Sequence, residues 1–168
     1  MYRHLVHVPL IFRLPDQIPS GKRIRAPVSQ LDLPATILDI LGLAKDRFPG
    51  TSLAECWSGN EAAWREKSVV VESLPGIVPE PDLPLGRRGG MISFLNAEAQ
   101  VIYNEDGKLE LYRFSQDPEE RVNLANTPGG RELVQRITSN TARLIPDRIW
   151  QQFGIPEHLR PKSPASGN

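Results

Sequence analysis

Residues 8–12, Val-Pro-Leu-Ile-Phe, form a short apolar run in which polar and apolar side chains do not alternate. This pattern is typical of a strand buried on both faces, as in a parallel sheet. Such a strand needs neighbouring strands and covering layers, yet only seven residues precede Val8. The sequence therefore predicts that this segment belongs to a larger body and leaves an exposed apolar surface without it.

The clearest helix signal in the N-terminal half lies between Asp32 and Gly42. Asp32 is placed to cap the start, Pro34 sits in the first turn, and Gly42 falls where a left-handed residue ends a helix. A second extended piece is expected at 23–28. The helix has an apolar stripe made by Leu33, Ile37, Leu38, Ile40 and Leu41.

The C-terminal half has the pattern of an antiparallel meander. Strands are predicted at 68–72, 91–95, 100–103 and 109–114, and the Asp-Gly pair in 104–107 favours a hairpin turn. A helix opens at Thr127-Pro128 and stops before Pro146, with Leu133, Ile137, Thr141 and Leu144 on one face. A short helix at 61–67 and a long proline-rich loop at 74–90 complete the expected elements.

Composition and charge exclude few classes of protein, but they argue against nucleic acid as a partner and against a membrane span. Twenty basic residues balance twenty acidic ones among 168, so no overall field favours nucleic acid as a partner. No apolar run approaches the roughly 20 residues that span a bilayer. The N-terminus lacks the pattern of a signal peptide, and the compartment stays unknown, because an export signal would lie upstream of Met1. The single cysteine, Cys56, forms no intrachain disulfide.

Two blocks of sequence resemble the sulfatase family of the alkaline phosphatase superfamily. The first comprises Val-Pro-Leu-Ile-Phe-Arg at 8–13, Ile-Pro-Ser-Gly-Lys at 18–22, the segment from Val28 to Gly42, and Gly-Thr-Ser-Leu at 50–53. Its one departure is that Pro34 stands one place before the family's usual proline. The second block is Glu-Leu-Tyr at 110–112, followed by Asp117-Pro-Glu-Glu and Asn-Leu at 123–124. The blocks follow one another in the family's order.

The resemblance implies an α/β fold, namely the C-terminal part of a sulfatase. It places the end of the catalytic domain at 1–67 and a small antiparallel sheet with its helix at 68–146. Residues 147–168 are expected to form a partly disordered tail. In complete members the reaction is hydrolysis of a small sulfate ester, with formylglycine and a divalent metal, usually calcium, as cofactors.

The family's catalytic elements lie N-terminal to the segment that begins at Val8, so this chain is expected to hold no nucleophile, metal ligand or cofactor and to be inactive alone. Cys56 lacks the Cys/Ser-x-Pro/Ala-x-Arg motif and is interpreted as a packed residue. His4 and His7 lack a nearby carboxylate pair and are interpreted as surface or packing residues. The expected partner is the missing N-terminal catalytic part.

Other polar residues have both a functional and a structural interpretation. Asp32 and Asp39 are interpreted as a helix cap and a solvated face rather than an acid/base pair. The acidic group at 117–120 is interpreted as an Asp-Pro turn rather than a calcium loop. Arg87 and Arg88 are the one candidate for the rim of the substrate cleft, against a solvated basic pair.

Two alternatives to a sulfatase fragment stay open. The chain is also compatible with a free-standing binding module derived from a sulfatase tail, or with the tail of a related phosphodiesterase or phosphonate hydrolase. The unalternating run at 8–12 favours the fragment, because a free-standing module is expected to have lost such a surface.

Overall fold

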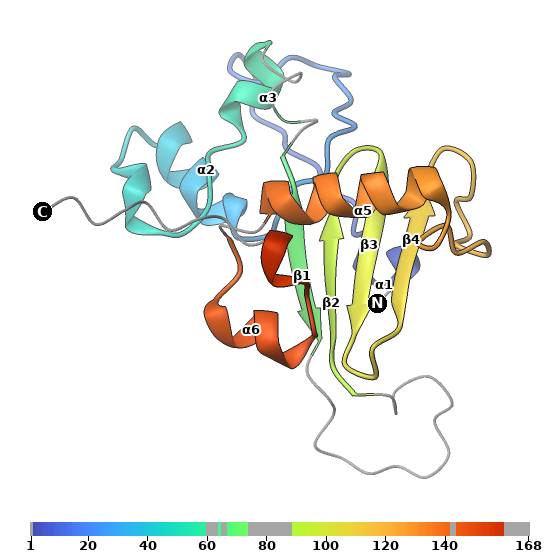
Figure 1. The fold of residues 1–168 in the computed structure, drawn as a ribbon. Coiled ribbons are helices and arrows are strands. Elements are labelled where there is room, and N and C mark those ends of the chain that lie inside the picture. The colour runs from blue at the N-terminus through green and yellow to red at the C-terminus, as the bar shows by residue number, and fades with distance from the viewer. Residues whose placement is uncertain (1, 60–63, 65–66, 74–88, 142–143, 160–168) are drawn as a thin grey trace, which may run out of the picture.

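A four-stranded antiparallel sheet organises the C-terminal half of the protein (Figure 1). The computed structural model describes residues 2–59, 64, 67–73, 89–141 and 144–159. The strands lie in the order β1-β2-β3-β4, and each pairs with the next along the chain. Their bounds are β1 Val69–Ser73, β2 Met91–Leu95, β3 Ala99–Asn104 and β4 Leu109–Arg113, which confirms the predicted meander.

The turn between β3 and β4 has the predicted geometry. Gly107 has a φ of 85°, in the left-handed region that glycine adopts without strain. Its N–H donates to the carbonyl of Asn104 at 3.0 Å, and the Lys108 N–H donates to Asp106 Oδ1 at 2.9 Å. The Asp-Gly pair therefore closes the hairpin and sets the register in which Ile102 faces Glu110.

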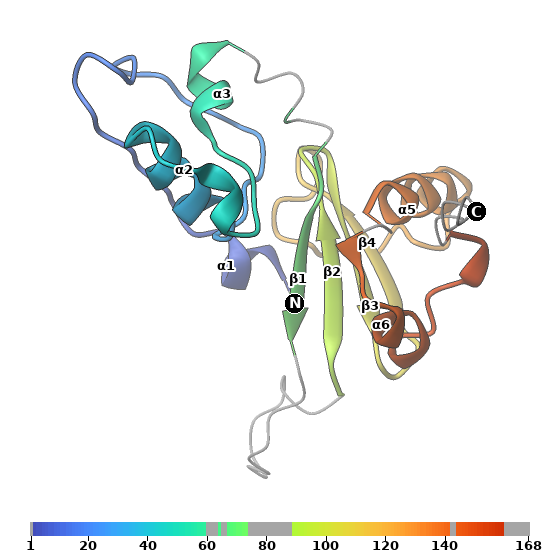
Figure 2. The ribbon, with the colours of Figure 1, turned by 90° about the vertical axis from the view of Figure 1, so that its left-hand side faces the viewer.

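Short helices surround the sheet, and Figure 2 shows them divided between its two faces. Helices α5 and α6 cover one face, whereas α1, α2 and α3 lie on the other side. The bounds are α1 Arg3–Val6, α2 Asp32–Ile40, η1 Lys45–Arg47, α3 Ala54–Ser58, α5 Pro128–Thr141, α6 Asp147–Gln152 and η3 Glu157–Leu159. In the described part of the chain no helix is long and apolar enough to cross a membrane.

The main core lies between the sheet and helices α5 and α6. Alternate strand residues point toward α5, as the two-residue period of a strand requires. Phe94 and Val101 are completely buried there, against Ile137 of α5. The opposite face is polar as well as buried. Gln100 and Ser93 have no exposed surface, and the Gln100 amide donates to Ser93 Oγ at 2.7 Å.

A second, smaller core lies in the N-terminal half. Its buried members are Ala26, Leu53, Cys56 and Trp64, with Phe12, Ile24, Val28, Leu33 and Trp57 packed around them. The two cores lie on either side of the boundary expected between residues 67 and 68. That boundary itself stays a prediction.

The expectation that residues 8–12 form a strand is wrong for this chain. The segment has no strand assignment, and Ile11 is 88% exposed. The reason is that no strand of the described residues lies beside it to complete a ladder. The piece at 23–28 is likewise not a strand. The exposed apolar surface expected in the absence of a larger body is present.

Helix α2 forms where expected, but its most deeply buried residues are not those of the predicted apolar stripe. The described burial is at Asp32, Ala35 and Thr36, whereas Ile37 and Leu41 of the predicted apolar stripe are exposed. Asp32 is the first residue of the helix rather than its N-cap, which is Leu31. Part of the apolar stripe, Ile37 with Leu41 after the helix end, is therefore left uncovered by the described residues, whereas Leu33 packs against the smaller core.

Residues 147–159 of the expected tail contain α6 and η3, and the expectation of a partly disordered tail at 147–168 stays a prediction. Ile149, Trp150 and Phe153 return the chain to the main core, together with Ile155 and Leu159. Spacings of three and four residues place the first three side chains on one face of α6 and its end. Leu144, in contrast, is 54% exposed rather than part of the buried face. The expectations at 61–67 and 74–90 fall almost wholly outside the described residues.

Truncation of Ile137 is expected to weaken the sheet layer by about 2–5 kcal/mol, because it leaves a cavity between α5 and β3. Native-state hydrogen exchange of the β3 amides should detect the change in Ile137→Ala. Val122→Ala is the matched control, since Val122 is 58% exposed. Equal exchange in the two variants would contradict the assignment of this core.

Candidate functional site

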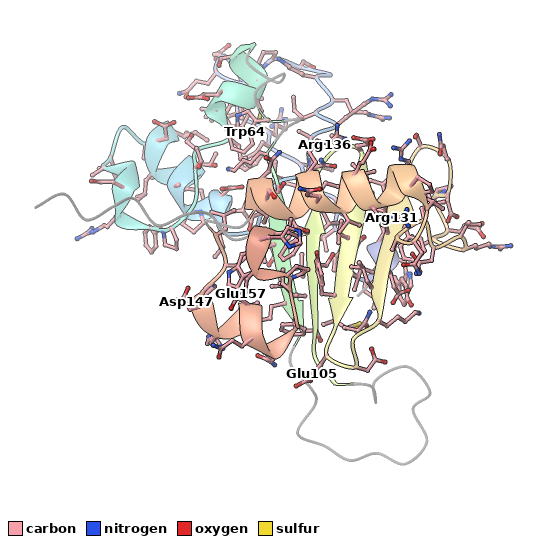
Figure 3. All side chains as sticks on the ribbon, viewed as in Figure 1. Trp64, Glu105, Arg131, Arg136, Asp147 and Glu157 are labelled. Carbon is pink, nitrogen blue, oxygen red and sulfur yellow. The ribbon has the colours of Figure 1, made fainter. Side chains whose placement is uncertain are left out.

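No catalytic constellation is formed by the described residues. Arg87 and Arg88 lie outside them, so the predicted cleft rim is not located. Cys56 is buried, and His4 and His7 are exposed. Figure 3 shows the labelled ionisable side chains spread over the surface rather than converging: Glu105, Arg131, Arg136, Asp147 and Glu157.

The described residues do not fit the divalent metal that complete sulfatases use. Within residues 2–59, 64, 67–73, 89–141 and 144–159, no group of three His, Cys, Asp or Glu side chains is placed to hold a metal ion. The acidic group at 117–120 instead makes a turn. Asp117 Oδ2 accepts the N–H of Val122 at 2.8 Å, and Glu120 takes a left-handed φ of 55°.

The polar face of the sheet carries a buried carboxylate at Glu110, which is 2% exposed. The Tyr112 hydroxyl donates to it at 2.5 Å and the Asn104 amide at 3.0 Å. The Lys108 ammonium lies 3.0 Å away, and the Tyr2 hydroxyl donates at 3.3 Å. Burial alone would raise the pKa of Glu110, but the hydrogen bonds from Tyr112, Lys108 and Asn104 outweigh it and lower the pKa.

A second carboxylate holds the same N-terminal segment. Glu120 Oε2 accepts the backbone N–H of Arg3 at 2.7 Å, one of the donors that the start of α1 leaves unpaired. The Arg3 guanidinium lies 5.2 Å above the ring of Phe114. Burial raises the pKa of Glu120, and the Arg3 N–H and the His4 charge oppose that rise. We call Glu110 and Glu120 the carboxylate clamp.

The carboxylate clamp joins the two sequence blocks that resemble sulfatases. Glu110 and Glu120 belong to the downstream block, and they bind Tyr2 and Arg3, which lie a few residues before the upstream block begins at Val8. The segment that leads into residues 8–13 is thereby fixed on the polar face of the sheet, opposite α5. Its chemistry is that of a positioning device, because Glu110 and the Oε2 of Glu120 accept hydrogen bonds from donors of the chain itself. Glu120 Oε1 is buried and has no hydrogen-bond partner among the described residues.

A third buried carboxylate, that of Asp32, connects separate segments of the upstream block. Asp32, 2% exposed, accepts the backbone N–H groups of Ser29 at 3.0 Å and Thr51 at 2.8 Å. Lys67 lies 3.2 Å from Asp32 Oδ1 and 3.9 Å from the ring centre of Trp64. Asp32 is therefore a structural hub that ties α2 to the loop at 50–53, rather than one half of an acid/base pair with Asp39.

The conformation of the loop at 50–53 also depends on glycine at residue 50 and on the hydroxyl of Thr36 in α2. Gly50 has a φ of 111°, and a Cβ there would lie 2.2 Å from the carbonyl oxygen of Leu31. The Thr36 hydroxyl donates to the carbonyl of Asp32 at 2.6 Å and accepts the N–H of Leu53 at 2.9 Å. The Gly-x-Ser-Leu motif is thus bound to α2 by contacts that no larger side chain at residue 50 would permit.

The third feature is an open apolar surface on the N-terminal half. Its side chains come from α1, from the segment at 8–11 after it, from α2, and from the residues that flank α2 and η1. They are between 42% and 88% exposed. We call these residues the open surface: Leu5, Val8, Leu10, Ile11, Leu31, Ile37, Leu41, Leu43 and Phe48. A hollow lined by Leu38, Leu43, Ala44, Asp46 and Arg47 adjoins it. Exposed large apolar side chains gathered in one half of a chain are typical of surfaces that another protein part covers.

Sequence reasoning missed the carboxylate clamp. Glu110 stands in a recognised motif, but the motif predicts none of its contacts and gives no role to Tyr2 or Asn104. The available signal was an acidic residue at an inward position of a strand, beside an aromatic hydroxyl and an amide. The contacts with Tyr2 and Arg3 span more than 100 residues and carry no local signature.

Comparison with solved structures identifies the fold. The structure of BT4656 in complex with its substrate D-glucosamine-2-N,6-O-disulfate matches with a TM-score of 0.55 and 19% identity. The match covers 89% of this chain and 29% of that one. The chain therefore has the fold of the C-terminal part of a sulfatase, as the sequence predicted. It spans less than a third of the length of that protein.

Two further structures give smaller TM-scores. BT1596, a 2-O GAG sulfatase, matches at 0.49 with 20% identity over 80% of this chain and 29% of its own. The phosphonate monoester hydrolase of Agrobacterium radiobacter matches at 0.46 with 19% identity over 68% and 25%. No family model and no curated protein matches the sequence.

Removal of the Asp32 carboxylate is expected to release the loop at 50–53. In Asp32→Ala the amides of Ser29 and Thr51 lose their acceptor, which corresponds to about 1–3 kcal/mol of local stability. Hydrogen exchange of the Thr51 amide should become faster, while that of β3 stays unchanged. Asp46→Ala provides an exposed carboxylate as the control. Unchanged exchange at Thr51 would contradict the role of Asp32.

The carboxylate clamp predicts a pH dependence with a defined sign. Since the folded state lowers the pKa of Glu110, its contribution to stability is present above the unfolded value and is lost as pH falls through the folded value. Glu110→Gln should therefore flatten the fall in β4 amide protection below the ordinary pKa of 4.5. Glu132→Gln, at an exposed position of α5, should leave the pH profile unchanged.

Proposed function

We propose that this chain, which has the fold of the C-terminal part of a sulfatase, forms the C-terminal portion of a sulfatase-like hydrolase. One observation carries the proposal: the match to BT4656 takes in 89% of this chain while leaving most of that protein unmatched. The complete enzyme would hydrolyse a small sulfate ester. BT4656 itself is seen in complex with a small sulfated sugar, D-glucosamine-2-N,6-O-disulfate, as its substrate.

The contribution of this portion would be structural. The carboxylate clamp fixes the N-terminal segment against the small sheet, and the Asp32 hub fixes α2 against the loop at 50–53. The side chains of the open surface are 42% to 88% exposed and take no part in either core. Docking of the missing N-terminal part on that surface would join it to the small sheet and its helices as one body.

The chemistry would come from the missing part. Complete members of the family supply a formylglycine nucleophile and a divalent metal, usually calcium, and the described residues offer no group that fits either. The residues of this chain would bury the apolar surface of the catalytic part and hold the small sheet beside it. Arg87 and Arg88 stay candidates for the rim of the cleft.

The open surface favours a fragment over a free-standing binding module. Soluble monomers rarely expose a contiguous patch of large apolar side chains. Ile11, Leu5 and Leu41 are 88%, 65% and 63% exposed. A module that acts alone would gain by replacing such residues with polar ones, whereas a portion of a larger protein needs them for burial.

Two outcomes are expected when the chain is produced alone. It should self-associate or precipitate because of the open surface, and it should not hydrolyse 4-nitrophenyl sulfate or 4-nitrophenyl phosphate with calcium present. Co-expression with the polypeptide encoded directly upstream in the same reading frame should give a soluble complex that hydrolyses the sulfate ester. Light scattering and product absorbance measure the two effects.

Two results would contradict the proposal. The first is metal-dependent turnover by the purified chain, which would place a nucleophile within it. The second is an upstream region that lacks both Cys/Ser-x-Pro/Ala-x-Arg and an acidic cluster. A soluble monomer of the chain alone with a sharp, cooperative melting transition would separately contradict the role of the open surface.

A further inference from the structure

We propose that the carboxylate clamp is a pH-dependent attachment, which holds residues 2–6 on the sheet most tightly at mildly acidic pH and less tightly at neutral and at strongly acidic pH. The proposal concerns contacts within this chain and does not rest on the proposed function. It follows from the unequal supply of hydrogen-bond donors to the two buried carboxyl groups of the clamp.

The carboxylate of Glu110 is well supplied with donors. Its Oε1 accepts the Asn104 amide at 3.0 Å. Its Oε2 accepts the Tyr112 hydroxyl at 2.5 Å and the Tyr2 hydroxyl at 3.3 Å, and the Lys108 ammonium lies 3.0 Å from the same oxygen. Because donors reach both oxygens and a positive charge lies beside one of them, the site favours the ionised form.

The carboxyl group of Glu120 is as buried but poorly supplied. The residue is 9% exposed, and its Oε2 accepts the N–H of Arg3 at 2.7 Å. Its Oε1 is buried and has no hydrogen-bond partner among the described residues. The guanidinium of Arg3 lies over the ring of Phe114. Since a buried charge with an unsatisfied oxygen costs more than a neutral acid, the site favours the protonated form.

The other ionisable side chains around the clamp come from α1 and its N-cap, from β4 and the turn before it, and from the turn that carries Glu120. They are Tyr2, Arg3, His4, Lys108, Tyr112, Asp117, Glu119 and Arg121. Glu119 and Arg121 form an ion pair with each other. The charges of His4, Arg3 and the amino terminus favour the ionised form of Glu120, but burial outweighs them and raises its pKa.

The directions of the two pKa shifts place the tightest attachment near pH 4.5, the ordinary value of both carboxyl groups. Because the folded state lowers the pKa of Glu110, its contribution is present above 4.5 and is lost as pH falls through the folded value. Because the folded state raises the pKa of Glu120, its contribution is present below 4.5 and is lost as pH rises through the folded value. Ionised Glu120 gains water when residues 2–6 detach, so neutral pH favours detachment.

The test follows the Arg3 amide of the full chain by hydrogen exchange and NMR, because that N–H donates to Glu120. Its protection, corrected for the pH dependence of the intrinsic exchange rate, should be greatest near pH 4.5. It should fall about threefold or more as pH rises to about 7.5, and it should also fall at lower pH. The protection of the β3 amides shows whether the sheet stays folded over the same range.

Two variants separate the carboxyl groups. Glu120→Gln keeps an oxygen that can accept the Arg3 N–H but carries no charge, so it should abolish the fall at neutral pH and keep the fall at low pH. Glu110→Gln should abolish the fall at low pH and keep the fall at neutral pH. Glu119→Gln is the matched control, because this neighbouring carboxylate is 65% exposed and should leave both falls unchanged.

A carbon-13 NMR titration of the carboxyl groups in the unchanged chain tests the proposal even if a variant does not fold. Glu120 should titrate above its ordinary pKa of 4.5 and Glu110 below it. The proposal is overturned if Glu120 titrates at or below that value, or if protection of the Arg3 amide does not fall toward neutral pH. It is also overturned if Glu120→Gln still loses that protection. None of these results bears on the proposed function.

Discussion

The carboxylate of Glu110 is the interaction on which the joining of the two halves depends. It lies on the face of the sheet opposite α5 and receives donors from β3, β4 and the N-terminal segment. A buried carboxylate is tolerated only when donors replace the water that it has lost. Tyr112 and Asn104 do so from the sheet. Tyr2 adds a donor that ties the first residues of the chain to a strand more than 100 residues later.

Glu120 reinforces this attachment by a different means. Its left-handed φ of 55° is uncommon for a side chain with a Cβ, and the Asp-Pro turn imposes it. The turn directs the carboxylate to the first N–H of α1. Burial raises the pKa of Glu120, whereas the hydrogen bonds that Glu110 accepts lower the pKa of Glu110. The same segment is therefore held by two acids that both take up a proton as pH falls, Glu120 at a higher pH than Glu110.

Helix α2 illustrates how an element can form as predicted and yet bury the other face. Its apolar spacing predicts a helix correctly because that period is a local property. The buried contacts, however, are those of Asp32, Ala35 and Thr36 with the loop at 50–53 and with Lys67. Ile37 and Leu41 of the apolar stripe are exposed because none of the described residues covers them, while Leu33 packs against the smaller core. The polar contacts of Asp32 and Thr36 thus fix α2 in a position that leaves its members of the open surface exposed.

The sequence by itself determined the meander, the Asp-Gly hairpin, α2 and α5, because alternation, turn chemistry and helical period act over a few neighbouring residues. It also indicated the sulfatase fold through two ordered motifs. The tertiary structure decided that residues 8–12 stay unpaired, that residues 147–159 return to the core, and that Glu110, Glu120 and Asp32 act as anchors. Each of these depends on which distant surfaces are available to contact, and that availability is a property of the whole fold.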